Sequence, residues 1–435
     1  MKNFKKILML ISTLISLCWG SIRNLQINEN EKIIIFAPHP DDEILGCGGL
    51  IQKVIKKKGE VYIVYLTNGD HNQLPYRIYE KKIILNPSDY IKLGEIRRKE
   101  SIKATKILGV SENNLIFLGY PDFGILKIWE NYWGENKKPF RSFLTKASYV
   151  PYKENYSFGK PYKGESILED IKKIINEIRP SKIFITSPFD TNVDHRALYN
   201  FVRASLLEIE GLNPEVYIYL IHFRNYPLKN SEKLFLPEIF LLFKTYIVPL
   251  SNEEVKKKKI SLECFTSQMM FRKKWFFSFV KKNEIFYTKN DLILTKNLVF
   301  ESEKEAEFEN YKNLSYPFYI NLIKDDEFLK IEFIHKIKIL GPTEYVFYFF
   351  PFKKNIEFSK MPKLKINLKR KNEFITSVNS NFYKDLKYEK LKDKVSFKIK
   401  ISELKYPEYL FFSSNIKIGG INYDFIPWEV IKVEY

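Results

Sequence analysis

The sequence predicts an α/β domain followed by an antiparallel, β-rich domain, and two patterns of apolar residues indicate this. From residue 32 to about 222, short β-branched runs alternate with stretches whose apolar residues have helical spacing. Beyond about residue 300, apolar and polar residues alternate with period two. The first pattern is typical of a parallel sheet covered by helices, and the second of antiparallel sheets with one buried face. We therefore expect a mostly parallel sheet flanked by helices, then a β-sandwich-like domain.

The first region contains five expected strands separated by four expected helices. The strands are 33–36, 61–66, 115–118, 183–185 and 216–220, and the helices are 44–58, 90–108, 167–178 and 195–208. Two long interruptions, 70–87 and 123–163, are predicted to be loops at one end of the sheet.

The later part of the chain divides into a basic stretch and the β-rich end. Residues 251–265 have helical spacing, and basic side chains are frequent from 256 to 274. Period-two segments at 329–333, 363–368 and 395–399 are expected strands of the sandwich. The aromatic run 345–350 is interpreted as core packing rather than as a surface for sugars.

The composition indicates a folded chain with a basic surface. Its 435 residues are enough for two or three domains, and 45% are hydrophobic. Lys and Arg total 71 against 52 for Asp and Glu, a net charge of +19, most of it within residues 1–295. No nucleic-acid-binding signature accompanies this charge, so we expect no nucleic-acid partner and interpret the excess as a solvated basic surface.

The amino terminus predicts export. Lys2, Lys5 and Lys6 precede an almost unbroken apolar run at 7–19, which is the layout of a signal peptide and is short for a transmembrane helix. We expect a signal peptide at 1–20 and a periplasmic, cell-surface or extracellular protein. An uncleaved anchor, or a lipid anchor at Cys18, remains an alternative.

A histidine and three carboxylates follow the first expected strand within five residues. They are His39, Asp41, Asp42 and Glu43, and a helix with several glycines comes directly after them. Loops at the carboxyl ends of parallel strands form ligand sites in open α/β sheets. A histidine nitrogen and a carboxylate oxygen can bind Zn²⁺, leaving another carboxylate for proton transfer. The alternative is that Asp41 or Asp42 only caps the helix.

A second polar cluster follows the expected strand 183–185. It runs from Asp190 to Arg196 and includes His195. His39, Asp42 and His195 would provide three protein ligands and leave a fourth position for water, as in catalytic zinc sites. For the other histidines, His71, His222 and His335, we expect structural roles.

Taken together, these motifs resemble the PIG-L/LmbE-like deacetylases, zinc enzymes that remove acetyl groups from N-acetylglucosaminyl compounds. The resemblance covers about residues 32–290. It depends on the motifs at 39–43, 97–100, 120–122, 194–197 and 257–268. It implies a Rossmann-like, LmbE-like fold, a zinc cofactor, and an N-acetylated sugar, glycan or glycolipid as substrate.

The resemblance also implies roles for individual residues. It makes His39, Asp42 and His195 the metal ligands and Asp41 the general base. Where the family usually has another histidine, this chain has Asn192, which can donate a hydrogen bond to an oxyanion but cannot donate a proton.

Three further residues have implied roles with open alternatives. Arg97 and Asp122 would lie near the sugar, but Arg97 could instead form an ion pair with Glu100. Asp194 would orient His195 or cap its helix. Residues 129–133 are a further candidate for substrate contact.

We thus predict a signal peptide at 1–20, a deacetylase domain at 30–295 and a β-rich domain of unknown role at 300–435. Peripheral membrane association or a lipid anchor is an additional expectation. The alternative function is a non-catalytic surface glycan-binding protein on a degenerate deacetylase scaffold.

Overall fold

The computed structural model describes residues 22–301, 318–335, 343–369, 373–377, 388–390, 394–418 and 421–435. The expected signal peptide lies outside these residues, and so does the side chain of His335. Across the described part of the chain, no helix combines the length and apolar character needed to cross a bilayer.

The chain forms two compact units that are not consecutive stretches of sequence. The first comprises residues up to 126, 139–162 and 166–289; the second comprises 127–138, 163–165 and 290–435. Residues 127–138, within the interruption at 123–163, and residues 163–165, at its end, therefore belong to the β-rich unit.

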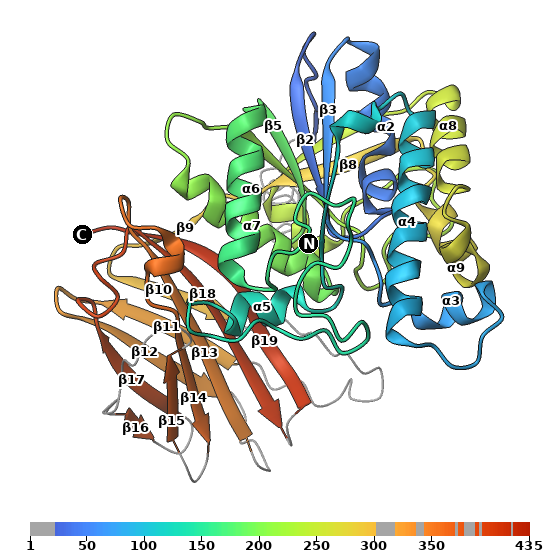
Figure 1. Ribbon diagram of the computed structural model, residues 1–435. Helices are drawn as coiled ribbons and strands as arrows, with labels where there is room; N and C mark the ends of the chain where they lie inside the picture. Colours follow the sequence, from blue (N-terminus) through green and yellow to red (C-terminus); the bar gives the residue numbers. More distant parts are fainter. Residues whose placement is uncertain are drawn as a thin grey trace, which may run out of the picture. The chain divides into compact units, whose positions relative to one another are not determined.

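An eight-stranded, mostly parallel sheet forms the centre of the first unit (Figure 1). Its order is β1-β7-β8-β6-β5-β2-β3-β4, and only β8 runs antiparallel to its neighbours. The strands are β1 (Arg23–Asn24), β2 (Lys32–Ala37), β3 (Glu60–Thr67), β4 (Leu115–Tyr120), β5 (Lys182–Thr186), β6 (Glu215–Tyr219), β7 (Lys244–Pro249) and β8 (Asn283–Thr288). The predicted α/β class is confirmed, because the expected buried runs form β2 to β6.

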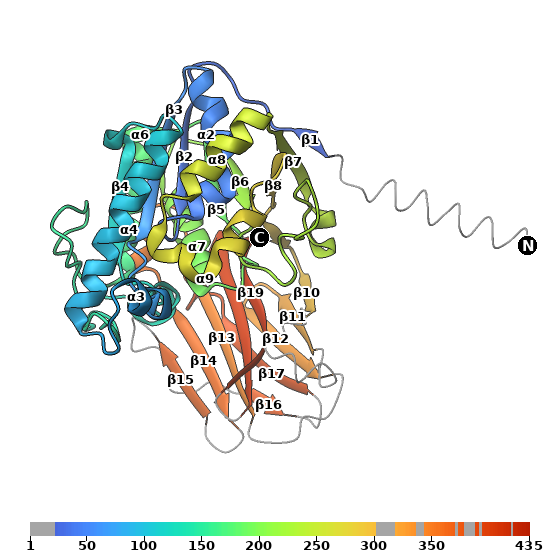
Figure 2. The same cartoon turned by 90° about the vertical axis from the view of Figure 1, so that its right-hand side faces the viewer.

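Helices cover both faces of this sheet. The helices of this unit are α2 (Asp42–Lys56), α3 (Gln73–Tyr79), α4 (Pro87–Ile107), α6 (Gly164–Ile178), α7 (Val193–Glu208), α8 (Asn252–Leu262) and α9 (Thr266–Ser278), with 3₁₀ turns η1 (Glu112–Asn114) and η2 (Glu238–Leu242). Most of α5 (Ile125–Asn131) belongs to the second unit. Helices α2, α4, α8 and α9 contact one another on one face, which Figure 2 views, and α6 and α7 lie together on the other.

The glycines after the first motif allow α2 to pack closely. A Cβ atom on Gly46 would lie 2.4 Å from Tyr219 Cδ2, and one on Gly49 would lie 2.3 Å from Leu250 Cδ2. Any larger residue would push α2 away from these neighbours, so the glycines fix the position of the helix that carries the motif.

The strand order has its switch point between β2 and β5. The chain passes from β2 to β3 and β4 on one side, then returns to β5 and β6 on the other. The loops after β2 and β5 therefore leave the sheet side by side, where open α/β sheets bind ligands. Both predicted motifs lie in these loops.

The second unit contains two antiparallel-type sheets. A five-stranded sheet has the order β10-β11-β12-β17-β16, and a six-stranded sheet has the order β15-β14-β13-β18-β19-β9, with β9 pairing in parallel. The bounds are β9 (Leu292–Leu294), β10 (Asn297–Glu301), β11 (Phe318–Lys324), β12 (Phe328–His335), β13 (Thr343–Phe352), β14 (Leu364–Lys369), β15 (Glu373–Ser377), β16 (Tyr388–Lys390), β17 (Lys394–Lys400), β18 (Tyr409–Ile418) and β19 (Ile421–Val433), with η4 at Phe358–Lys360.

A shared apolar core joins the two sheets of this unit. Phe347 of β13 lies 6.0 Å from Phe333 of β12 and 5.1 Å from Phe397 of β17, measured between ring centroids. Every residue from Tyr345 to Phe350 is buried. The sandwich-like architecture and the core interpretation of the aromatic run are confirmed.

The prediction that residues 129–133 contact substrate is wrong for the two tryptophans of this stretch. Trp129 and Trp133 are completely buried, and both belong to the β-rich unit. The Trp129 ring packs against Phe358 and Trp428 at centroid distances of 5.5 and 5.6 Å. These tryptophans pack on the face of the six-stranded sheet that points away from the core between the two sheets, where burial stabilises their large aromatic rings.

Candidate metal centre

The loop after β2 is held by the neighbouring strand. Both the backbone N–H and the hydroxyl of Thr67, at the end of β3, donate to Pro38 O at 3.0 Å. This fixes the start of the loop, which then turns through Asp41 with φ +117° into α2. Such a conformation is rare for a residue with a side chain and is typical of functional loops. The Asp41 side chain does not cap the helix, so the simple capping alternative fails for this residue.

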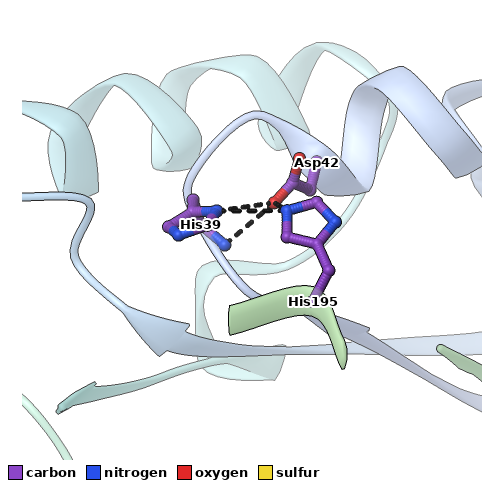
Figure 3. Close-up of side chains that lie close together, drawn as sticks. All are labelled: His39, Asp42 and His195. Atoms are coloured by element: carbon purple, nitrogen blue, oxygen red, sulfur yellow. Dashed lines mark hydrogen bonds and ion pairs between the residues drawn. The ribbon is translucent and has the colours of Figure 1, made fainter. Parts of the chain in front are cut away.

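Three side-chain atoms converge from the loop after β2 and from the first turns of α2 and α7 (Figure 3). Asp42 Oδ2 lies 3.1 Å from His39 Nδ1 and 3.1 Å from His195 Nε2. The two ring nitrogens are 3.3 Å apart. All three residues are buried, and these atoms form one of two groups in the described chain with the spacing of metal ligands. The structure thus brings the three predicted ligands together.

The donor set fits a divalent cation. Four ligands at about 2.0–2.1 Å in a tetrahedron are about 3.3 Å apart, close to the three separations found here. Two imidazole nitrogens and a carboxylate oxygen form a set that zinc accepts well. The nitrogens that point at each other also need a shared positive charge between them, because two lone pairs at this distance repel.

The pKa shifts of His195 and Asp42 also indicate that this cluster favours positive charge. Burial opposes protonation of His195, but the carboxylates of Asp190 and Asp42 outweigh it and raise the pKa of the ring to about 9. Burial likewise disfavours the Asp42 carboxylate, yet the two histidines hold its pKa well below the usual value. Protons and a metal ion are alternative sources of the positive charge, since ligands must be deprotonated to bind metal.

Asp190, rather than Asp194, orients His195. Asp190 Oδ2 lies 3.1 Å from His195 Nδ1 and also accepts the backbone N–H groups of Ile221 and His222 at 3.2 and 2.9 Å. This corrects the expectation for Asp194. Residue 194 precedes His195 on the same helix and projects in another direction, whereas residue 190 lies in the loop and can reach back to the ring.

Asp194 and Asp122 lie instead on the far side of His39. His39 Nε2 is 3.1 Å from Asp122 Oδ1 and 3.4 Å from Asp194 Oδ2. Burial opposes protonation of His39, but these carboxylates raise its pKa well above the usual value. Carboxylates that accept the second N–H of a ligating histidine fix its tautomer. Asp122 therefore supports His39 from a buried position.

The same three residues form the second group with metal-ligand spacing. It offers a single imidazole, however, and both Asp194 oxygens and one Asp122 oxygen already accept backbone N–H groups. Asp194 accepts Phe123 N at 2.5 Å and Ile125 N at 3.1 Å, and Asp122 Oδ2 accepts His71 N at 3.0 Å. The His39–Asp42–His195 group is thus the better candidate metal site.

Arg97 holds Asp41 and the loops around it. Its Nη2 donates to Asp41 Oδ2 at 2.9 Å and to Pro40 O at 2.7 Å, and its Nη1 donates to Gly69 O at 2.8 Å. The alternative ion pair with Glu100 is not formed, because Glu100 accepts from Thr266 and Ser267 at the start of α9. Arg97 is almost completely buried, so it positions Asp41 and exposes little of its guanidinium group to a substrate.

Asp41 has the character of a base that works near neutral pH. Burial raises the pKa of its carboxyl group to about 7; the Arg97 guanidinium lowers it in part, and the neighbouring Asp42 carboxylate raises it. Glu43 accepts the Asp41 N–H at 2.9 Å and is itself completely buried. Its bond helps to maintain the unusual backbone of Asp41.

Asn192 begins α7 as its N-cap. Its side-chain Oδ1 accepts the Asp194 N–H at 2.9 Å, which satisfies one of the free N–H groups of the first turn. Because the carbonyl side of the amide is used in this way, Nδ2 is the group that remains to donate to a ligand.

His222, one of the histidines expected to be structural, lies at the edge of the cluster. The His222 ring centroid is 5.0 Å from that of His195, and the ring stacks on Trp275 at 5.1 Å with an interplanar angle of 2°. Arg272 lies over Trp275 at 5.6 Å, and its charge also lowers the pKa of Asp41. His222 follows β6, whereas Arg272 and Trp275 belong to α9, and no motif spacing in the sequence indicates this contact.

Comparison with known proteins agrees with the motifs. Residues 34–206 match the PIG-L family, described as GlcNAc-PI de-N-acetylase. A glucosamine-6-phosphate deaminase-like protein of Bacteroides thetaiotaomicron is 22% identical over an alignment of 257 residues. The alignment covers 55% of this chain and 36% of that protein. The chain thus spans about a third of that relative.

Two solved structures are similar at low sequence identity. An N,N'-diacetylchitobiose deacetylase from Pyrococcus horikoshii is 21% identical, with a TM-score of 0.34 over 59% of this chain and 82% of that one. The hydratase GalB, from Pseudomonas putida, is 15% identical, with a TM-score of 0.37 over 57% and 82%. The family match includes both motifs of the metal centre, and the chain therefore contains a PIG-L family domain at residues 34–206.

Proposed function

We propose that this chain is a divalent-metal-dependent N-deacetylase that releases acetate from an N-acetylglucosamine-type sugar of a glycan or glycolipid. The observation that carries the proposal is the convergence of His39 Nδ1, Asp42 Oδ2 and His195 Nε2, with the buried Asp41 carboxylate beside them. The match to a family described as a de-N-acetylase supports the reaction class. The donor set favours zinc as the ion.

The chemistry that zinc would supply there, held by His39, Asp42 and His195, is polarisation of the acetamido carbonyl and a lowered pKa of water. Asp41 accepts a proton from the attacking water as its oxygen bonds to the acetyl carbon. The bond from that carbon to the sugar nitrogen then breaks, and Asp41 passes the proton to the departing amine. The products are acetate and the free amino sugar.

The surrounding residues act by positioning and by hydrogen bonding. Arg97 keeps Asp41 in its unusual backbone conformation, and Asp190 and Asp122 fix the two histidine rings. Asn192 Nδ2 would donate to the oxygen of the acetyl group as negative charge develops on it. Asp41 carries out both proton transfers in this scheme, because Asn192 cannot donate a proton.

We also propose that the protein acts outside the cytoplasm. The support is the basic start and the apolar run at 7–19. Sequencing the amino terminus of the protein recovered from the exported fraction would reveal cleavage near residue 20. Recovery of the full-length chain in the cytoplasm would contradict export.

The test of function is acetate release by zinc-loaded protein from a panel of free N-acetylated sugars, chitin oligomers and N-acetylated glycolipids. We expect release from at least one sugar, and loss of at least 100-fold in kcat for Asp41→Asn with its zinc content unchanged. Asp326→Asn, an exposed aspartate of the β-rich unit, is the matched control. Full activity of Asp41→Asn would exclude the assigned base, and a zinc-bound but inactive wild type would exclude the proposed reaction.

A further inference from the structure

An aromatic ring stands at the edge of the metal centre without a place in the chemistry described so far. Phe123 follows Asp122 directly after β4, and its backbone N–H donates to Asp194 Oδ2 at 2.5 Å. That same oxygen lies 3.4 Å from His39 Nε2. The Asp194 carboxylate therefore links the Phe123 backbone to His39, a candidate metal ligand.

The conformation and exposure of Phe123 do not help the fold. Its φ angle is +59°, in the left-handed region that a residue with a side chain adopts only at an energetic cost. The residue is 49% exposed, so about half of its surface gains nothing from burial. Glycine or asparagine would fill this turn more easily. An unfavourable backbone that presents a large apolar ring to solvent beside a catalytic cluster points to a ligand.

One face of the ring is supported by a neighbour. The His71 imidazole lies against it with ring centroids 4.6 Å apart and an interplanar angle of 33°. His71 is itself held by its backbone N–H, which donates to Asp122 Oδ2 at 3.0 Å. Both rings are therefore fixed relative to the carboxylates behind His39.

We propose that Phe123, supported by His71, is a platform on which the pyranose ring of the substrate stacks while its acetamido group is at the metal centre. This rests on the proposed function and adds the class of contact that selects a sugar. The face of an aromatic ring carries partial negative charge, which attracts the polarised C–H groups on the apolar face of a pyranose. Sugar sites combine such a surface with a few polar groups.

The first test compares substrates with and without a sugar ring. Zinc-loaded full-length protein is assayed on N,N'-diacetylchitobiose and on N-acetylethanolamine, a small acyclic amide. In Phe123→Asn, which suits the left-handed backbone but lacks the ring, we expect the ratio of kcat/KM for sugar to that for acyclic amide to fall about five- to tenfold. Phe123→Trp should keep a ratio near that of the wild type.

Phe143→Asn is the matched control, because Phe143 is 78% exposed elsewhere on the same unit and stacks only with Lys146 among its described contacts. Its ratio should equal that of the wild type. A second measurement, saturation-transfer NMR with N-acetylglucosamine, should show strong transfer to one face of the sugar in the wild type and in Phe123→Trp, and weak transfer in Phe123→Asn.

The two proposals fail in different ways. An unchanged substrate ratio and an unchanged saturation-transfer pattern in Phe123→Asn would overturn the platform while leaving deacetylation intact. A fall in melting temperature that accounts for the whole loss of activity would assign Phe123 to folding and overturn it as well. Absence of acetate release by the wild type from every N-acetylated compound would overturn the proposed function, and the platform with it.

Discussion

Asp190 Oδ2 lies 3.1 Å from His195 Nδ1, on the side of the imidazole opposite the nitrogen that faces Asp42. The backbone N–H groups of Ile221 and His222, just after β6, donate to the same oxygen, so the carboxylate is fixed before any metal binds. A carboxylate can only accept, which places the hydrogen on Nδ1 and leaves the lone pair of Nε2 for a metal ion.

Replacing Asp190 should therefore weaken metal binding without removing a ligand. We expect Asp190→Asn to raise the dissociation constant for Zn²⁺ about 10- to 100-fold, because the tautomer and orientation of His195 are no longer enforced. Competition with a fluorescent chelator measures this. Asp326→Asn serves as the control, and equal affinity in both variants would show that Asp190 does not act on the ligand.

Removal of the metal should lower both activity and stability. We expect a chelator to abolish acetate release, and Zn²⁺ added back in slight excess to restore it. When the free zinc concentration is about 100 times the dissociation constant, binding stabilises the fold by about 2.7 kcal/mol, so the melting temperature should rise with zinc. Asp42→Asn should lose most of this rise. The same zinc-dependent rise in Asp42→Asn would place the metal elsewhere.

The pH dependence of kcat/KM should report Asp41. The base must be ionised, so activity should fall as the pH drops through its pKa, which burial raises to about 7; a bound cation would move this limb lower. The Arg97 charge favours the ionised form. Arg97→Gln should therefore shift the acid limb upward by about 1 pH unit. Lys99→Gln, on the exposed side of α4, should leave the limb unchanged, and an unmoved limb in Arg97→Gln would contradict the pairing.

Two substitutions at Asn192 separate its cap from its proposed catalytic bond. Serine keeps an acceptor for the Asp194 N–H but has no amide donor, whereas alanine loses both. We expect Asn192→Ser to keep its melting temperature and lose about 100-fold in kcat. Asn192→Ala should lose activity similarly and about 1 kcal/mol of stability. A fully active serine variant would reduce Asn192 to a helix cap.

Trp129 should matter for the stability of the β-rich unit. Its ring is completely buried among aromatic side chains of that unit, so Trp129→Ala should lower the free energy of unfolding by about 3–5 kcal/mol. Urea unfolding followed by limited proteolysis would assign the loss. Val299→Ala, at an exposed apolar position of the same unit, should change stability by less than about 0.5 kcal/mol.

Local pattern predicted much of the fold because periodicity is a property of neighbouring residues. The expected strands and helices around β2 to β6 match those observed. The expected helical stretch 251–265 forms α8, which ends at Leu262, and a separate helix, α9, begins at Thr266. The break is held by Glu100, which accepts the Thr266 hydroxyl and the Ser267 N–H from 166 and 167 residues away. The residues around the break contain no sequence pattern that predicts such a distant partner.

By itself, the sequence determined the α/β class, the sandwich-like end and the three residues that converge on the candidate metal centre, because short motifs at the ends of parallel strands must meet at one edge of a sheet. Tertiary structure alone decided which side chains support them. Arg97 reaches Asp41 across 56 positions, and Trp129, although it lies between strands of the α/β region in sequence, packs against aromatic side chains of the β-rich unit. Hydrogen bonds and burial between distant segments depend on tertiary packing, which hydrophobic periodicity and motif spacing do not predict.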